Sequence, residues 1–486
     1  LDSPTQRVGG APLTEFKQVN HPVRMLSIED MHELKEEEIE NTNETSEHNL
    51  IEWYKKTLNA LPANQSTFTV EPKIDGVAVS IMYKNSKLQY AATRGDSETG
   101  DDITQNILTI KSIPTSLPNN APHTFEIRGE VFMPNKAFEE LNKARSEEGK
   151  TKFINPRNAT AGTLKQLDPR VVSKRPIDVI FHSFGQIDDL DLKTIEQYRK
   201  YLMELNLPVD KWFKIIQSSE QLRTAVLELD SDRHTFPYGT DGAVIKVNLI
   251  ESHKSLGHTS KFPRWACAYK YRPEQGQTIL KEVTIQVGRT GVLTPVAELE
   301  PIFISGTTVS RATLHNQDEI IRKDIRIGDT VVIEKSGEII PAVIKVNLEK
   351  RPDNTVPFSL HSHINGKCPS CASTISKESG FTAWRCNNSK CPDQSIAKLK
   401  HFGGRRMLEL EGLGISVAEK LVTSGLITHP LDLFELRSDE LAKMELEPAK
   451  LNSGATSKPR KFGEKKAKKL IESIQKSKDL PFSRWL

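Results

Sequence analysis

The chain has 486 residues, of which 27% are charged, and its formal net charge is +3. This length exceeds what one hydrophobic core can organise, so we expect three to five domains. The nearly balanced charge excludes binding through a uniformly basic surface, so any contact with nucleic acid must come from local clusters. No stretch approaches the roughly 18 consecutive apolar residues of a membrane span.

Residues 67–272 alternate short β-rich runs with helical segments and turns, which predicts a mixed α/β domain. Within it, "VEPKIDGVAVSIMY" predicts a strand over residues 74–83 that begins directly after Lys73. Glu71 and Asp75 flank this lysine, and the glycine that follows would let a ligand approach the backbone. A single lysine of this kind is most often a surface residue. A deprotonated and positioned lysine is instead a nucleophile toward carbonyl carbon or phosphorus.

Further segments place charged residues at strand ends and glycine turns. They read "YAATRGDSETGDDIT", "FEIRGEVFM", "FINPRNATAGTLKQLDPR", "GTDGAVIKV" and "RWACAYKYRP". At such positions, arginine, lysine and carboxylate side chains could grip a ligand that carries phosphate. Their joint occurrence favours a functional role for Lys73.

Residues 273–365 change in character. The run "TVVIEKSGEIIPAVIKV" and its neighbours form short β-rich segments separated by glycine turns. This pattern is typical of a small β-barrel.

Four of the five cysteines lie within 24 residues, spaced C-x2-C and C-x4-C around a gap of 14 residues. They are Cys368, Cys371, Cys386 and Cys391. Four thiolates on two knuckles can close a tetrahedral shell around Zn²⁺, which predicts a structural zinc site that supports folding. The clustering argues against a secreted disulfide scaffold and for a reducing compartment. Cys267 is predicted to be a small apolar core residue.

From residue 396 the chain is rich in lysine and leucine, with helical spacing interrupted by glycines. Gly412 and Gly414 separate two helical segments, and Gly463 does the same further on. A glycine hairpin can bring the N–H groups of a helix N-terminus close to a phosphate. Taken singly, each hairpin also fits an ordinary helix–helix turn.

Together these motifs resemble those of the bacterial NAD⁺-dependent DNA ligases. The similarity runs from "SPTQRVGG" to the last residue and includes "KIDG", "TRGD", "RGEVFM", "NPRNATAG", "DGAVIKV", "AYKY", "QVGRTGVLTPVA" and "ATLHN". The resemblance implies a multidomain α+β fold. Its parts would be a nucleotidyltransferase (adenylation) domain at 1–272, an OB-fold β-barrel at 273–365, a four-cysteine zinc finger at 366–395 and an incomplete helix-hairpin-helix domain at 396–486.

In that family a lysine attacks the α-phosphorus of NAD⁺, expels nicotinamide mononucleotide and holds AMP as a phosphoramide. The AMP then passes to the 5′-phosphate at a nick, and the 3′-hydroxyl displaces it. The resemblance therefore implies sealing of nicked double-stranded DNA in replication and repair, with NAD⁺, Mg²⁺ (or Mn²⁺) and Zn²⁺ as cofactors. We expect a cytoplasmic, nucleoid-associated monomer that has no membrane partner.

The resemblance also implies roles for individual residues. Lys73 would be the nucleophile, while Asp75 and Asp241 would support the lysine and the metal. The nucleotide pocket would be lined by Ser27, Ile28, Glu71, Arg94, Glu130, Lys246 and Lys270. Adenine would meet Glu71, the ribose Arg94 and Glu130, and the α-phosphate the last two lysines. Contacts with DNA are expected from Arg157, Lys165, Gly412, Gly414 and Gly463.

The chain departs from the family pattern at its ends and at a few positions. In the family, a helical domain that grips nicotinamide mononucleotide precedes "SPTQRVGG", and a BRCT-like domain follows the helical tail. We therefore interpret the chain as a fragment that reacts poorly with NAD⁺ alone but seals nicks already carrying 5′-AMP. Ser97 stands where glycine is usual, Lys165 replaces an expected arginine, and Lys335 and Glu338 differ from the usual "RAGDVIP". Lysine in place of arginine loses bidentate phosphate geometry.

Three alternatives remain. Other covalent nucleotidyltransferases, such as ATP-dependent ligases and capping enzymes, share K-x-D-G but not the cysteine cluster or "NPRNATAG". A non-catalytic nick-binding clamp would need a decayed pocket, whereas every expected site residue is present. A structural zinc protein without a DNA role is the third.

Overall fold

The computed structural model describes residues 15–34, 38–39, 44–62, 67–149, 152–188, 191–272, 274–304, 307–336, 340–377, 380–404, 407–446, 460–481 and 484–485. The chain divides into two compact units, Leu1–Arg272 and Pro273–Leu486. Each unit is described by itself below. Glu338, one of the departures from the family pattern, lies outside the described residues.

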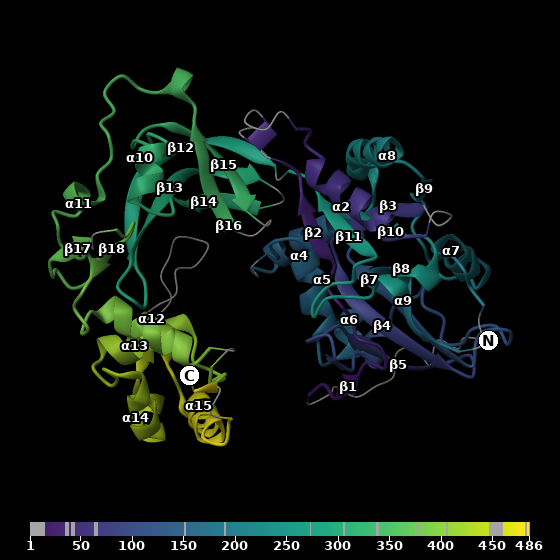
Figure 1. Cartoon of the computed structure of the whole chain (residues 1–486). Coiled ribbons are helices and arrows are strands. Elements are labelled where there is room, and N and C mark those ends of the chain that lie inside the picture. Colours follow the sequence, from purple (N-terminus) through teal and green to yellow (C-terminus); the bar gives the residue numbers. More distant parts are fainter. Residues whose placement is uncertain are drawn as a thin grey trace. The chain divides into compact units, whose positions relative to one another are not determined.

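The first unit is built on two antiparallel or mixed sheets and a small two-stranded ribbon (Figure 1). Its strands are β1 (Gln18–Asn20), β2 (Glu29–His32), β3 (Phe68–Ile74), β4 (Val77–Lys84), β5 (Lys87–Thr93), β6 (Thr99–Asp101), β7 (Thr124–Phe132), β8 (Asp178–Ile187), β9 (Lys214–Ile216), β10 (Thr240–Val247) and β11 (Ala266–Lys270). Its helices are α2 (His48–Asn59), α3 (Thr104–Ile107), α4 (Asn135–Glu147), α5 (Pro156–Leu164), α6 (Pro169–Val172), α7 (Ile195–Glu204), α8 (Ser219–Asp232) and α9 (Ile250–Leu256).

The first sheet has the strand order β2-β11-β10-β3-β9. Successive side chains of a strand point to opposite faces. Phe68 and Val70 of β3, with Ile245 of β10, therefore share one face and are fully buried. Helices α2 and α8 cover this face through buried side chains such as Leu50 and Leu222 (Figure 1). The polar and charged side chains of the same strands, such as Glu71 and Lys73 of β3, point to the opposite face.

The second sheet has the strand order β5-β4-β7-β8. Its core includes Ile81 and Ile127 on the strands and Tyr198 and Leu202 on α7. The mixed α/β prediction for this region is thus confirmed, with antiparallel pairing dominating both sheets.

The strand predicted over residues 74–83 is wrong at its start. The structure ends β3 at Ile74 and begins β4 at Val77. The dipeptide between them crosses from one sheet to the other, because β3 pairs with β10 while β4 pairs with β7. Lys73 thus lies near the end of a strand. The Asp75-Gly76 dipeptide at the break is a turn signal, but it does not show that the strands on either side pair in different sheets.

The second unit contains a closed barrel and a helical region. The barrel strands, in spatial order, are β12 (Gln275–Val287), β13 (Leu293–Ile304), β14 (Thr307–Thr313), β16 (Ile340–Val346) and β15 (Thr330–Ser336). The prediction of a small β-barrel is confirmed. Helix α10 (Gln317–Arg322) packs Ile320 into the barrel core.

The remaining elements of the second unit are short. They are α11 (Leu360–His363), β17 (Ile375–Lys377), β18 (Trp384–Cys386), α12 (Pro392–Phe402), α13 (Ile415–Thr423), α14 (Ser438–Lys443), β19 (Glu445–Leu446), β20 (Arg460–Lys461) and α15 (Glu464–Ser477). Leucine side chains from α12 to α15 form one core, including Leu399, Leu421 and Leu470. Among the helices in the described ranges, none is both long and apolar enough to cross a bilayer.

Ser97 is held in a backbone conformation that is unfavourable for residues with a Cβ. Its φ angle is +89°, and its position is fixed by bonds from its N–H to the Arg94 carbonyl (3.0 Å) and from the Met25 N–H to its own carbonyl (3.0 Å). A residue with a Cβ is strained in this region, whereas glycine is not. The departure from the family's glycine therefore carries a cost in stability.

We predict that Ser97→Gly raises the free energy of unfolding by roughly 0.5–1 kcal/mol, because the relief of strain exceeds the added entropy of the unfolded chain. Urea unfolding followed by circular dichroism measures the change. Ser116→Gly, at an exposed loop position without a positive φ, is the matched control and should lower stability. A destabilised Ser97→Gly protein would contradict the prediction.

Candidate active site and zinc centre

A cavity of about 370 Å³ lies in the first unit and is lined by both sheets. The first sheet contributes Glu71, Lys73, Val244, Lys246 and Lys270. The second sheet contributes Ala78, Gly129, Glu130, Ile180 and His182. A cavity of this size, with several convergent charged groups, is typical of a small-molecule site.

Lys73 forms an ion pair inside the cavity with Asp241. The lysine Nζ lies 2.9 Å from Oδ1 and 2.8 Å from Oδ2 of this carboxylate, whose side chain is only 3% exposed. A β-bulge brings them together, because Thr240 pairs with Ile74 and Gly242 with Lys73, leaving Asp241 as the extra residue between them. Bulges re-aim a side chain in this way.

A second lysine reaches the same carboxylate from the next strand. Gly242 of β10 pairs with Lys73 on one side and with Lys270 on the other, so the two lysines flank a residue without a side chain. A Cβ at Gly242 would lie 2.0 Å from the Tyr269 carbonyl oxygen, so glycine is required there. The Nζ of Lys270 is 3.7 Å from Asp241 and 3.2 Å from Asp30.

Glu71 and Lys246 form another ion pair in the cavity, and the Nζ of Lys246 also donates to the His182 carbonyl oxygen at 2.9 Å. The side chains are 12% and 4% exposed. Burial raises the pKa of Glu71, and the adjacent ammonium of Lys246 opposes that rise. Glu71 is therefore paired with a lysine on the neighbouring strand β10 and not with Lys73, two residues away in the chain.

Asp75 makes its direct hydrogen bond with an arginine, although Lys73 is close enough to lower its pKa. Its Oδ1 accepts a hydrogen bond of 3.0 Å from Nη1 of Arg157. Burial raises the pKa of Asp75, while Arg157 lowers it and the nearby Asp241 carboxylate adds to the rise. Arg157 lies in the first turn of α5, where the side chain of Asn155 caps the helix by accepting from the Asn158 N–H at 2.7 Å. Asp75 thus bonds Arg157 directly, and its predicted support of the lysine stays a prediction.

Ser27, Ile28, Arg94 and Glu130 all line the cavity. Arg94 Nη1 lies 3.5 Å from the Ser27 hydroxyl. Oε2 of Glu130 is buried without a hydrogen-bond partner among the residues that the structure describes. Burial raises the pKa of Glu130 to about 8, although Lys73, Arg157 and Arg94 oppose the rise. A buried acceptor of this kind favours a ligand that donates hydrogen bonds.

The predicted DNA contacts fall in different places. Arg157 lines the cavity, whereas Lys165 is exposed directly after α5 and is outside the cavity lining. In the second unit, Gly414 and Gly463 stand at the N-caps of α13 and α15, and Gly412 has a φ of +93°. A Cβ added at Gly414 or Gly463 would meet no described atom within 4 Å, so the backbone there is open.

The contributors to the cavity that sequence reasoning missed include Asp30, His182 and Arg128. Asp30 pairs with Lys270, His182 offers its backbone carbonyl, and Arg128 lines the wall. The alternation of Glu126, Arg128 and Glu130 in "FEIRGEVFM" was a signal for the arginine. The contribution of His182 could not be predicted from its residue type, because every residue has a backbone carbonyl.

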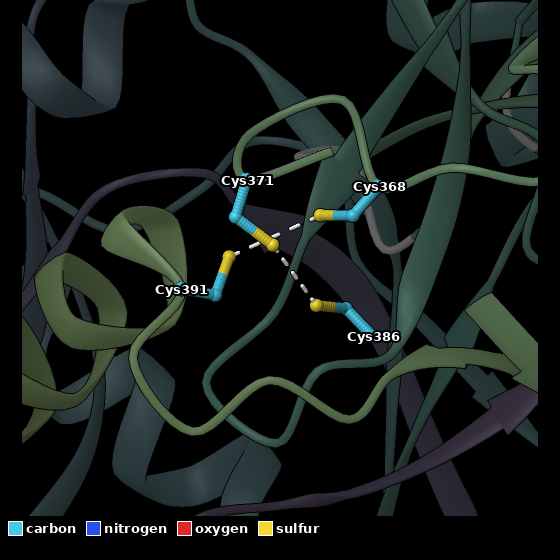
Figure 2. A group of neighbouring side chains, drawn as sticks. All are labelled: Cys368, Cys371, Cys386 and Cys391. Atoms are coloured by element: carbon cyan, nitrogen blue, oxygen red, sulfur yellow. Dashed lines mark hydrogen bonds between the residues drawn. The ribbon is translucent and has the colours of Figure 1, made fainter. Parts of the chain in front are cut away.

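The four predicted zinc ligands converge in the second unit (Figure 2). All four sulfurs lie within 4.8 Å of one another, with Sγ–Sγ distances of 3.9 Å for Cys368–Cys391 and 3.5 Å for Cys371–Cys386. Zn–S bonds of about 2.3 Å in a tetrahedron place sulfurs roughly 3.8 Å apart. The residues therefore fit Zn²⁺. Cys267 is fully buried in the core of the first sheet, as predicted.

The cysteine knuckles are fastened to the barrel. The Cys386 N–H donates to the Gly291 carbonyl at 2.8 Å, in the hairpin between β12 and β13. Gln394 on α12 donates to the Cys386 carbonyl at 2.8 Å, and Lys377 pairs with Asp318 of α10 at 3.0 Å. The metal site thus connects the barrel hairpin to the start of the helical region.

Two protein-family matches divide the chain near Arg272, where the two compact units also meet in the sequence. Residues 13–274 match the NAD-dependent DNA ligase adenylation domain, and residues 277–355 match the NAD-dependent DNA ligase OB-fold domain. These matches define the class: a nucleotidyltransferase domain followed by an OB-fold.

Similar curated proteins include a DNA ligase of Akkermansia muciniphila, 51% identical over 485 residues, covering 100% of this chain and 59% of that protein. A DNA ligase of Methylacidiphilum infernorum is 42% identical (99% and 65%), and DNA ligase 1 of Opitutus terrae is 40% identical (100% and 68%). The chain belongs to the NAD-dependent DNA ligase family, and it spans about three fifths of the length of the first of these relatives. A solved ATP-dependent ligase of bacteriophage T7 matches at a TM-score of 0.27 with 14% identity, covering 66% of this chain and 98% of that one, which is too low to carry an argument.

The Glu130 carboxyl makes stability depend on pH. Its pKa in the folded chain, about 8, exceeds the ordinary value of 4.5, so the folded state binds this proton more tightly. The stability it contributes is present below pH 4.5 and is lost as the pH rises to 8. Glu130→Gln stays neutral, so we predict that its stability relative to the natural protein increases between pH 5 and 8 by on the order of 4 kcal/mol.

Urea unfolding at pH 5, 6.5 and 8 tests this dependence. Glu139→Gln, at an exposed position on α4, is the matched control and should show no such trend. The prediction would be contradicted if the free energies of unfolding of Glu130→Gln and the natural protein differed by the same amount at all three pH values.

The zinc site gives a second prediction. We expect about one zinc ion per chain, and Cys386→Ser should lose most of it together with the cooperative unfolding of this region, because structural zinc supplies folding energy. Atomic emission measures the metal. Cys267→Ala should keep its zinc, and full zinc retention by Cys386→Ser would exclude the site.

Proposed function

We propose that this chain is part of an NAD⁺-dependent DNA ligase that forms a lysyl-AMP at Lys73 and seals 5′-phosphate/3′-hydroxyl nicks in duplex DNA, in replication and repair. The observation that carries the proposal is the Lys73 amine, held 2.8–2.9 Å from Asp241 in a nucleotide-sized cavity beside Lys270. Family membership supports NAD⁺ as the donor of AMP.

Lys73 would attack the α-phosphorus of NAD⁺ as a neutral amine. The new N–P bond replaces the bond to nicotinamide mononucleotide, and the amine gives up its proton. Asp241 holds the amine in place, and the Lys270 ammonium lies 3.7 Å from the same carboxylate. An arriving phosphate would compete with the carboxylates for Lys270 and Lys246.

The other cavity residues would position the nucleotide. Glu71 is placed for the adenine edge, and the unpartnered Oε2 of Glu130 is suited to accept from ribose hydroxyls, with Arg94 nearby. Ser27 and Ile28 line the same cavity. Transfer of this kind depends mainly on positioning and on neutralising charge at the phosphoryl oxygens.

Mg²⁺ (or Mn²⁺) would neutralise phosphate charge when it is bound. Asp75 and Asp241 are close enough for each carboxylate to influence the other, and they supply the oxygen ligands that such cations prefer. Magnesium is commonly held by one or two carboxylates plus substrate phosphates, so this pair fits it. Arg157 would then exchange Asp75 for a phosphate oxygen.

The second unit would grip DNA without reading bases. Gly414 and Gly463 leave backbone open at the starts of α13 and α15, and Gly412 supplies a positive φ just before α13. Lys465, Lys466, Lys468 and Lys469 are exposed on α15. Lys165 would add a contact from the first unit. Phosphates would dominate such binding, which makes it sensitive to salt. We propose the corresponding organisation, with a zinc finger at 366–395 and a helix-hairpin-helix domain at 396–486, acting as a monomer in the cytoplasm.

The natural protein, Lys73→Ala and Lys87→Ala provide the test. After prolonged incubation with NAD⁺ and Mg²⁺, with which this chain is expected to react slowly, mass spectrometry should still find AMP on the natural protein and on Lys87→Ala, whose substitution is at an exposed lysine of β5. Lys73→Ala should carry none, because its nucleophile is missing. Sealing of a nick that already carries 5′-AMP is the second measurement, since it does not need NAD⁺.

An AMP adduct on Lys73→Ala would contradict the assignment of the nucleophile. A natural protein that neither acquires AMP nor seals the adenylylated nick, but still binds nicked DNA, would be the non-catalytic clamp.

A further inference from the structure

Residues 23–28, here called the strap, join the two-stranded β1-β6 ribbon to the first sheet along the edge of the cavity. Before the strap, β1 pairs with β6. After it, β2 pairs in parallel with β11 of the first sheet. Met25, Leu26, Ser27 and Ile28 of the strap all line the cavity. The strap thus forms a wall of the nucleotide site whose position depends on its attachments.

One attachment is a buried arginine of the second sheet. Arg128 on β7 donates from Nη1 to the Arg24 carbonyl at 3.1 Å and from Nη2 to the Val23 carbonyl. Its side chain is 11% exposed. A planar guanidinium can donate to two successive carbonyls at once, which the single ammonium of lysine cannot reproduce.

Arg128 is itself fixed by Glu126 on the same face of β7. Nε of Arg128 donates to Oε1 of Glu126 at 2.7 Å, and this carboxylate also accepts from the Ser80 hydroxyl (2.8 Å) and the Gln186 N–H (2.9 Å). A Cβ at Gly185 would lie 2.0 Å from the Glu126 carboxylate, so the facing strand leaves room for it. The acid is fully buried yet well bonded, and this stiffens the orientation of the arginine.

We propose that Arg128 is a positioning residue for nucleotide binding. It fastens the strap to β7, so that Ser27 and Ile28 are held at the cavity, and Ser27 within reach of Arg94. This inference rests on the proposed function, because it assigns the cavity to the adenylate. Arg128 would raise nucleotide affinity indirectly, by holding the strap in place, and would not touch the nucleotide itself.

Arg128→Lys tests the proposal, since it keeps a cation beside Glu126 but loses at least one carbonyl contact. Glu126→Gln/Arg128→Met removes both charges, so that no unpaired acid remains buried. Arg351→Lys is the matched control: Arg351 is a similarly buried arginine of the second unit, 14% exposed, that bonds two acids and a backbone carbonyl. The measurements are calorimetric titration with AMP, thermal unfolding, and the KM and kcat for NAD⁺.

We expect the AMP dissociation constant to rise about tenfold in Arg128→Lys and further in the double variant, as the loss of charged hydrogen bonds implies. KM for NAD⁺ should rise with kcat little changed, the signature of lost uniform binding. Arg351→Lys should lower the melting temperature but leave AMP affinity unchanged.

AMP affinity within twofold of the natural protein in both Arg128 variants overturns the positioning role while leaving the proposed function intact. An equal loss of affinity in Arg351→Lys would reduce Arg128 to a general contribution to stability. Absence of AMP binding by the natural protein overturns the proposed function, and this inference with it.

Discussion

The ion pair between Lys73 and Asp241 is the interaction around which the cavity is organised. It exists because β10 carries one extra residue opposite β3. In a regular strand, successive residues face opposite sides, so a ladder without the bulge would direct this carboxylate differently. The extra residue instead places an acid beside the amine, and Gly242 then brings a second lysine alongside. Positions in the cavity are therefore set by strand register as much as by residue type.

Local sequence patterns predicted the zinc ligands and the β-barrel, because the constraints behind them act between residues close together in the chain. The two cysteine pairs must approach one metal, and their spacing carries that information by itself. The barrel is visible in its alternation of short apolar runs and glycine turns. Lys73 was identified by the recurrence of motifs, and its surroundings in the structure are consistent with that interpretation, although its role stays a prediction.

Other features depend on contacts that the sequence does not encode locally. Glu71 and Asp75 lie beside Lys73 in the chain, but their partners are Lys246 and Arg157, which lie more than eighty residues away in sequence. The Asp75-Gly76 turn marks a break after Ile74, but only the pairing of β3 with β10 and of β4 with β7 shows that the chain changes sheets there. The attachment of residues 23–28 by Arg128 joins segments about a hundred residues apart. Each of these follows from sheet register and topology.

In the cavity, acids and cations pair with one another: Glu71 with Lys246, Asp75 with Arg157 and Asp241 with Lys73. A phosphate-bearing molecule must break some of these pairs to enter, and it recovers that cost through its own charges. An uncharged adenosine-like compound that leaves the pairs intact avoids the cost altogether. The cavity therefore offers inhibitor chemistry a route to affinity through shape and hydrogen bonding, without the anionic groups that hinder passage into cells.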